Sequence, residues 1–152
     1  MFVSILILFS AILIITGSVT TGKNTYVAKN KEELYGTWIN PDYEEKAKPG
    51  KLTYDHNDVV RSYNTITSTK ERWNWKFVIT DKWIDDKGNI WYRWLITEAK
   101  FGAIYDTEKQ FYSGKISDSG KVLEYSYSTY NYPVEVNPDS LKYNYFIYRR
   151  QE

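Results

Sequence analysis

Residues 73–80 read Trp73-Asn74-Trp75-Lys76-Phe77-Val78-Ile79-Thr80, and this stretch decides the fold class. Every second residue from Trp73 to Ile79 is large and apolar, and most of the residues between them are polar. A period of two places alternate side chains on opposite faces of a β-strand, whereas a helix needs a period of 3.6. The stretch therefore predicts a strand that buries one face and continues to about Ile84.

The next segment repeats this pattern and predicts a hairpin. Residues 85–89 are Asp-Asp-Lys-Gly-Asn, a loop composition in which the glycine supplies a positive φ. After the loop, one alternating row contains Ile90, Tyr92, Trp94 and Ile96, and the opposite row contains Trp91, Arg93, Leu95 and Thr97. Two adjacent strands with aromatic inner faces are expected.

Further strands are predicted on both sides of this hairpin. A short helical turn is expected at residues 30–34, and extended segments are expected at 34–40, 51–54, 59–66, 109–117, 122–130 and 141–149. In the last of these, Leu141, Tyr143, Tyr145 and Ile147 are predicted to share one face. No run of ten residues has helical periodicity, so a parallel βαβ architecture is not expected.

Eight or nine short strands at regular spacing are typical of a sandwich or a barrel. Consecutive hairpins close most simply into an up-and-down barrel, and closure removes exposed sheet edges. The sequence therefore predicts an all-β fold, an up-and-down antiparallel β-barrel of about 8 strands.

The first 22 residues differ from the rest of the chain, since they contain no charged side chain. Residues 2–15 are almost wholly apolar, and small or polar residues follow at 16–22. About 7–15 apolar residues followed by small ones are typical of a secretory signal peptide, whereas a spanning helix needs about 20. We expect a signal peptide at 1–22, or alternatively a membrane anchor at 2–17, and one domain at 23–152. The protein is then exported, periplasmic or secreted, and touches a membrane only through an uncleaved leader.

Composition and single residues argue against several function classes. Lys and Arg number 20 and Asp and Glu number 19, so the basic excess of a nucleic-acid binder is missing. The chain has no Cys and one His, His56, in a predicted turn, so a disulfide framework and a zinc site are not expected. Asp81, Asp85 and Asp86 are interpreted as residues of a solvated hairpin. No catalytic motif, metal site or cofactor site is therefore predicted, and we expect a protein that is not an enzyme.

Two motifs at the ends of the domain resemble the lipocalin, or calycin, family of barrels. Leu34-Tyr35-Gly36-Thr37-Trp38 is similar to the Gly-x-Trp signature of the first strand in that family. Ile147-Tyr148-Arg149-Arg150 is similar to the late strand whose arginine packs on that tryptophan. The resemblance covers residues 33–150 and, because a domain of 23–152 is short for a lipocalin, it is to a small bacterial lipocalin-like protein. It implies a barrel floor formed by Gly36, Trp38 and Arg149, with Arg150 as the alternative cation.

The aromatic residues are the candidate binding site. Phe, Trp and Tyr make up 18% of the chain, and ligand pockets are mostly apolar and aromatic. The predicted ligand-binding residues are Trp73, Trp75, Phe77, Tyr92, Trp94, Tyr125, Tyr127, Tyr143 and Tyr145. The expected ligand is a small hydrophobic or amphipathic molecule enclosed without chemistry.

Two alternatives to a ligand carrier remain open at this point. The same rings can simply fill a small barrel, which predicts a protein-interaction module of the cell envelope with a packed core. Alternatively, Trp83, Trp91 and Tyr130 form a flat outer face that stacks on sugar rings, which predicts a carbohydrate-binding module.

Overall fold

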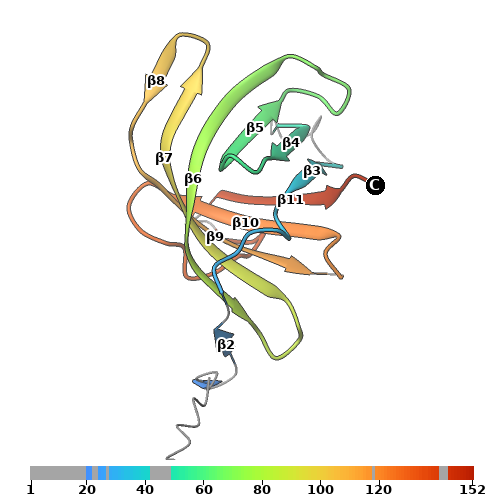
Figure 1. Cartoon of the computed structure of the whole chain (residues 1–152), viewed down its shortest axis with the longest axis vertical. Coiled ribbons are helices and arrows are strands. Elements are labelled where there is room, and N and C mark those ends of the chain that lie inside the picture. The colour runs from blue at the N-terminus through green and yellow to red at the C-terminus, as the bar shows by residue number, and fades with distance from the viewer. Residues whose placement is uncertain (1–19, 22–23, 27, 42–48, 118, 141–143) are drawn as a thin grey trace, which may run out of the picture.

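The computed structural model describes residues 20–21, 24–26, 28–41, 49–117, 119–140 and 144–152, which form strands and turns and contain no helix (Figure 1). The eleven strands are β1 (Thr20–Thr21), β2 (Asn24–Tyr26), β3 (Gly36–Ile39), β4 (Lys51–Tyr54), β5 (Val59–Tyr63), β6 (Glu71–Ile84), β7 (Ile90–Phe101), β8 (Ile104–Asp106), β9 (Gln110–Ser117), β10 (Val122–Ser128) and β11 (Asn144–Arg150).

Eight of these strands close into an antiparallel barrel. The sheet order is β1-β2-β6-β5-β4-β3-β11-β10-β9-β7-β8, and β6 also pairs with β7. The closed ring therefore consists of β3, β4, β5, β6, β7, β9, β10 and β11. Within the ring, each strand pairs with the strands before and after it in sequence, and β8, between β7 and β9, lies outside the ring. The last strand returns to the first, because Arg150 pairs with Trp38 and Arg149 with Ile39. The predicted all-β, up-and-down barrel is confirmed.

The elements differ from the prediction in several places, since β1 and β2 were not expected and the extended segment predicted at 59–66 ends at Tyr63. Strand β8 was not expected, and it pairs only with the end of β7, beside the barrel. Strands β6 and β7 contain register shifts between Lys76 and Phe77 and between Ile79 and Asp81. The extra residue is Thr97 of β7 in the first shift and Thr80 of β6 in the second. The second bulge reverses the alternation of β6, so Lys82 follows Phe77 and Ile79 into the interior. The expected helical turn is a hydrogen-bonded turn, in which the Leu34 amide donates to Lys31 O at 2.9 Å.

The chain enters the barrel at one end of β6. Strand β1 pairs with β2, and β2 pairs Thr25 with Ile84 and Tyr26 with Trp83. Figure 1 shows this segment running away from the barrel at the end opposite to β8. Thr20–Thr21 belongs to the region predicted as a leader, and residues 1–19 and 22 of that region lie outside the described residues.

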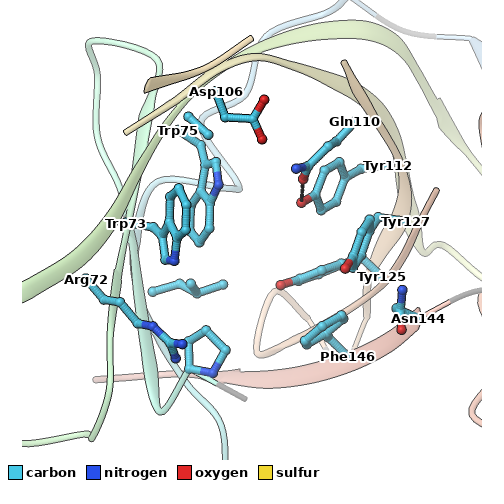
Figure 2. Close-up of a pocket in the computed structure, with 13 residues that line it drawn as sticks. Arg72, Trp73, Trp75, Asp106, Gln110, Tyr112, Tyr125, Tyr127, Asn144 and Phe146 are labelled. Atoms are coloured by element: carbon cyan, nitrogen blue, oxygen red, sulfur yellow. Dashed lines mark hydrogen bonds between the residues drawn. The ribbon is translucent and has the colours of Figure 1, made fainter. Parts of the chain in front are cut away.

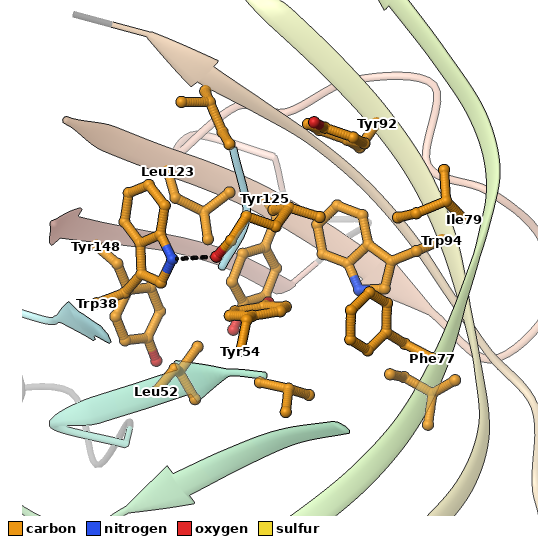
Figure 3. Packing of buried hydrophobic residues seen from close by; sticks show 14 residues of the cluster. Trp38, Leu52, Tyr54, Phe77, Ile79, Tyr92, Trp94, Leu123, Tyr125 and Tyr148 are labelled. Carbon is orange, nitrogen blue, oxygen red and sulfur yellow. Dashed lines mark hydrogen bonds between the residues drawn. The ribbon is translucent and has the colours of Figure 1, made fainter. Parts of the chain in front are cut away.

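The barrel interior near Trp38, here called the floor, is filled by a cluster of packed rings (Figure 3), and a space of about 320 Å³ lies beside it at this end of the barrel. Trp38, Tyr92, Trp94 and Tyr148 are each at most 1% exposed. The Trp38 indole N–H donates to Leu34 O at 2.8 Å, so its polar atom is satisfied inside the core. Burying such rings removes roughly 150–250 Å² of mostly apolar surface each from water, so this cluster stabilises the folded barrel.

One arginine covers the floor, and it is Arg150. Its guanidinium lies 4.3 Å from the Trp38 ring centroid, donates to Gly120 O at 2.8 Å and to Tyr35 O at 2.7 Å, and also reaches Glu33 O. Gly36 has φ +116°, a backbone conformation that L side chains rarely adopt, and a Cβ there would also lie only 3.1 Å from Arg150 Nη1. The assignment of Arg149 to the floor was wrong, since alternation along β11 turns its side chain outward, where it is exposed.

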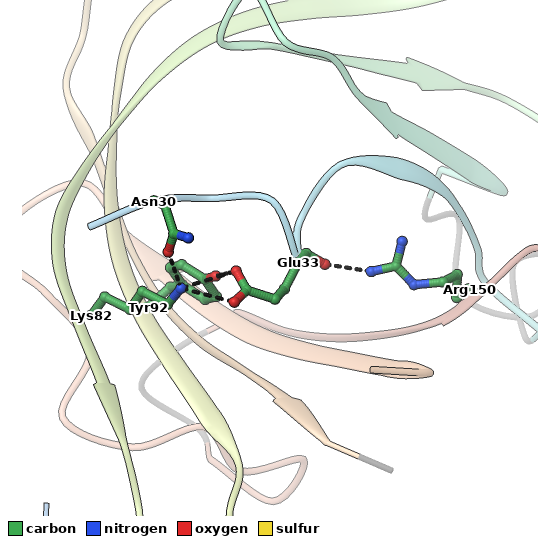
Figure 4. A network of polar contacts seen from close by, with 5 residues as sticks. All are labelled: Asn30, Glu33, Lys82, Tyr92 and Arg150. Carbon is green, nitrogen blue, oxygen red and sulfur yellow. Dashed lines mark hydrogen bonds and ion pairs between the residues drawn. The ribbon is translucent and has the colours of Figure 1, made fainter. Parts of the chain in front are cut away.

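A buried lysine ties the entering chain to the same floor (Figure 4). Lys82 is 4% exposed, and its ammonium contacts Glu33 Oε2 at 2.9 Å and Asn30 Oδ1. The Tyr92 hydroxyl donates to the same oxygen, Glu33 Oε2, and the Lys82 ammonium also donates to Glu33 Oε1 at 3.0 Å. Burial opposes ionisation of Glu33, but the bonds from Tyr92 and Lys82 outweigh it and lower the pKa of that carboxyl.

Candidate functional site

A cavity of about 420 Å³ occupies the barrel end opposite to the floor, here called the mouth (Figure 2). Its size falls within the range of small-molecule pockets. The lining residues come from strands that begin or end there and from the neighbouring loops: Pro49, Leu52, Arg72, Trp73, Trp75, Ala99, Asp106, Gln110, Tyr112, Tyr125, Tyr127, Asn144 and Phe146.

Two indoles from β6 form one wall of the cavity. Alternation along the strand turns both Trp73 and Trp75 inward, and their parallel rings lie 6.2 Å apart, centroid to centroid, at 8°. Phe101 of β7 supports Trp73 from the side at 5.1 Å. Among the residues that the structure describes, neither indole N–H has a hydrogen-bond acceptor, so both can donate to a bound molecule.

The opposite wall consists of stacked rings from β7, β9, β10 and β11. Tyr112 stacks on Trp94 at 5.2 Å and on Tyr127 at 5.3 Å, and Tyr125 stacks on Phe146 at 5.0 Å. Rings that stack on one another cover each other's faces, so their edges and hydroxyl groups are the parts that border the cavity. Figure 2 shows the oxygens of Tyr125 and Tyr127 pointing into the cavity.

Two buried phenols of this wall, those of Tyr112 and Tyr125, stay uncharged near pH 7. Burial raises the pKa of Tyr112 and of Tyr125 well above the usual value of a tyrosine. The Tyr112 hydroxyl donates to Gln110 Oε1 at 2.9 Å, which fixes the orientation of that amide at the mouth. The wall therefore offers uncharged hydroxyl groups beside apolar ring edges, which suits a ligand with an apolar body and few polar atoms.

The interior below this cavity is nearly filled. A second space of about 30 Å³ lies between Leu52, Tyr54, Trp75, Trp94 and Tyr112, with Val60, Ile96 and Tyr125 completing it. That volume accommodates about one water molecule. Because the floor half is packed and the mouth half is open, a ligand can enter from the mouth only as far as Leu52 and Tyr125.

The sequence-predicted binding residues separate into three groups. Trp73, Trp75, Tyr125 and Tyr127 line the cavity. Phe77, Tyr92 and Trp94 belong to the packed core below it, and of these only Trp94 reaches the second space.

The two residues predicted from the last strand are not part of the observed lining. Tyr145 pairs with Ser126 and donates to Glu124 Oε1 at 2.7 Å on the outer face, so its predicted inward orientation was wrong. Tyr143 lies outside the described residues.

The sequence did not predict the other nine of the thirteen lining residues. Phe146 is inside instead of Tyr145, because β11 has the opposite phase to the predicted one. Tyr112 alternates with Gly114 and Ile116 and could have been found from that pattern. Arg72, Asp106 and Asn144 lie at strand ends, where alternation carries no information, and their positions at the mouth depend on the closure of the barrel.

The other candidate residues have structural environments. His56 lies exposed in a turn, with its ring 4.1 Å from that of Tyr35. Asp85 accepts hydrogen bonds from the Lys87 and Asn89 amides and from the Trp91 indole at 2.8–2.9 Å, so it organises its hairpin loop. Within the described ranges, no group of three or more His, Cys, Asp or Glu is arranged to hold a metal ion.

The outer aromatic residues do not form one flat face. Trp83 and Trp91 stack directly on each other across β6 and β7, with centroids 5.7 Å apart at 7°. Arg93 lies over the Trp83 ring at 5.5 Å, and Lys115 lies 5.8 Å from the Trp91 ring centroid. Tyr130 is 89% exposed in the loop after β10 and is not in ring contact with them.

No family model matches the chain, and no curated protein or solved structure is significantly similar to it. Among the described residues, no helix is long and apolar enough to cross a membrane.

Proposed function

We propose that the chain is a lipocalin-like, non-enzymatic binding protein that encloses a small apolar or amphipathic ligand in the cavity at the mouth. The observation that carries this proposal is an aromatic cavity of about 420 Å³ above a solidly packed floor. The closed eight-stranded ring and the contact of Arg150 with Trp38 support the likeness to lipocalins. Affinity arises from removing apolar surface from water, at roughly 25 cal/mol per Å².

The decisive experiment is a titration of intrinsic tryptophan fluorescence with fatty acids and planar aromatic probes. Trp73 and Trp75 line the cavity, so a ligand that enters it is expected to shift or quench their emission. Saturable binding supports the proposal, and an unchanged spectrum with every apolar probe contradicts it.

A cavity-filling variant tests whether binding occurs at this place. Ala99 lines the cavity and is 3% exposed, so Ala99→Phe is expected to weaken binding at least tenfold by occupying ligand space. Val78→Phe is the matched control, because Val78 is 51% exposed on the outside of the adjacent strand. If Ala99→Phe fails to fold, Trp75→Ala removes part of the wall instead and is also expected to weaken binding.

We also propose that the protein works outside the cytoplasm, as residues 1–22 suggest. Expression of the full chain followed by fractionation and determination of the mature N-terminus tests this. Cleavage between residues 17 and 23 supports a signal peptide, an intact N-terminus in the membrane fraction supports an anchor, and intact protein in the cytoplasm contradicts export.

A further inference from the structure

Two side chains of opposite charge lie at the mouth without an ion-pair partner. Arg72 is exposed just before the first cavity tryptophan, and Asp106 is half-buried at the end of β8. No ion pair within the described part of the chain includes either of them, although Glu71 pairs with Arg61 at 3.2 Å next door. Asp106 Oδ1 accepts a hydrogen bond from the Glu108 amide at 2.8 Å, which orients the carboxylate and leaves Oδ2 available.

These two charges flank the indole wall. Figure 2 shows Asp106 on one side of Trp73 and Trp75 and Arg72 on the other, while Gln110 and Asn144 stand on the facing side of the cavity. Among the described lining residues, the ionised groups are therefore at the rim of the cavity, and the interior below contains rings and phenols. Such an arrangement separates a charged end of a ligand from an apolar end.

We propose that the ligand is a single-chain amphiphile whose head group is zwitterionic. This inference rests on the proposed binding function and specifies its ligand class. The apolar chain lies between the indoles and the phenols, the anionic group of the head faces Arg72, and its cationic group faces Asp106. The indoles next to the head add a favourable site for the cation.

Charge balance distinguishes this class from its neighbours. An amphiphile with only an anionic head is attracted by Arg72 but repelled by the like charge of Asp106. A cationic head is attracted by Asp106 but repelled by Arg72. A zwitterion satisfies both groups, so the rim selects it by attraction and rejects the singly charged heads by repulsion.

The test compares four ligands with the same dodecyl chain: dodecylphosphocholine, laurate, dodecyltrimethylammonium and dodecyl maltoside. Each is titrated below its micelle concentration by tryptophan fluorescence, with circular dichroism to verify that the barrel stays folded. We expect dodecylphosphocholine to bind about three- to fivefold more tightly than either charged ligand, and this preference to grow at low salt.

Two variants give opposite shifts if the inference is correct. Arg72→Gln is expected to improve binding of the cationic ligand and weaken that of laurate, and Asp106→Asn is expected to do the reverse. Arg149→Gln and Asp86→Asn, distant from the mouth, are matched controls that should leave the order of affinities unchanged.

Equal affinities for the four heads, or identical shifts in both variants, would overturn the zwitterion inference while leaving the binding function intact. Absence of binding by every dodecyl ligand and every apolar probe overturns the binding function, and this inference with it.

Discussion

Arg150 holds three chain segments together at the floor of the barrel. Its planar guanidinium stacks on Trp38 and donates to backbone oxygens of Glu33, Tyr35 and Gly120, so it joins the entering turn, β3 and the loop before β10. A lysine has the same charge but lacks the rigid fork of donors and the flat surface for stacking. The identity of this residue therefore matters more than its charge.

Arg150→Lys is expected to lower the free energy of unfolding by about 1–3 kcal/mol, because partly buried carbonyl oxygens lose their donors. Urea denaturation followed by tryptophan fluorescence measures the change. Arg149→Lys is the matched control, since Arg149 is exposed, and its effect is expected within about 0.5 kcal/mol. Equal effects of the two substitutions would contradict the role given to Arg150.

Asp85 makes the stability of the folded protein depend on pH in the acidic range. Burial opposes its ionisation, but the donors of Trp91, Asn89 and Lys87 outweigh it and lower the pKa to about 2. An aspartate in the unfolded chain has a pKa of about 3.9. Since the folded value is depressed, the stabilisation is complete above pH 4 and disappears as the pH falls toward 2.

Asp85→Asn is therefore expected to be less stable than the wild type by a constant amount from about pH 5 to 7. The difference should shrink between about pH 4 and 2, as urea denaturation at a series of pH values will show. Asp86→Asn in the same loop serves as the control. A gap that stays constant down to pH 2 would rule out the ionised carboxylate as the cause.

At the scale of elements, one glycine in β9 allows the aromatic side chains of the neighbouring strands to pack together. A Cβ at Gly114 would lie 2.8 Å from the Trp94 ring, from Tyr125 Cβ and from Glu124 O. Gly114 also pairs with Tyr92 on one side and Tyr125 on the other, so the barrel has its smallest residue where large rings meet.

Gly114→Ala is expected to destabilise the protein by about 1–3 kcal/mol through overpacking, since the contacts are to backbone and ring atoms that cannot move aside. Thermal unfolding by circular dichroism is the measurement. Val78→Ala, at an exposed position of β6, is the control. A more stable Gly114→Ala variant would show that the side chains around Gly114 are less tightly packed than these distances indicate.

Whether a strand could be predicted depends on how many of its residues alternate between large apolar and polar side chains. Strands β6 and β7 were predicted because their rows are long and their inner residues are aromatic. Strand β8 has three residues, too few for a period to be recognised. In β11 both alternate rows contain large side chains, with Tyr145 and Ile147 in one and Phe146 and Tyr148 in the other. Alternation alone could not select the inner row, and a shift by one residue exchanges the faces.

The candidate site was predictable only in part for a related reason. Alternation identifies residues that face inward, but it does not say at which height in the barrel they lie. Trp75 and Trp94 both face inward, yet one lines the cavity and the other packs below it, because the tilt and bulges of the strands determine the height. The charged rim requires closure of the whole ring and could not be derived from any single strand.

At the scale of the whole molecule, buried tyrosines make the folded barrel less stable at alkaline pH. Burial raises the pKa of Tyr54, Tyr112 and Tyr125, so these groups favour the folded state below the unfolded value of about 10. Their stabilisation is lost as the pH rises above that value toward the folded pKa, because the unfolded chain ionises first.

A spectrophotometric titration of tyrosinate absorbance tests this. We expect the native protein to ionise only part of its fifteen tyrosines near pH 10 and the remainder together with loss of its circular dichroism signal. Protein in concentrated urea provides the reference and should titrate in one step near pH 10. Complete ionisation of the native protein near pH 10 with an intact spectrum would contradict the buried positions of these rings.

The entry of the chain beside Ile84 and the opening beside Trp73 belong to opposite ends of the same strand. Ten residues of β-structure span about 30 Å. Tethering the molecule by its N-terminal side, to a bead or a bilayer, therefore leaves the mouth of the cavity facing away from the support. Any molecule that enters this cavity then comes from the surrounding solution and not from the surface to which the protein is attached.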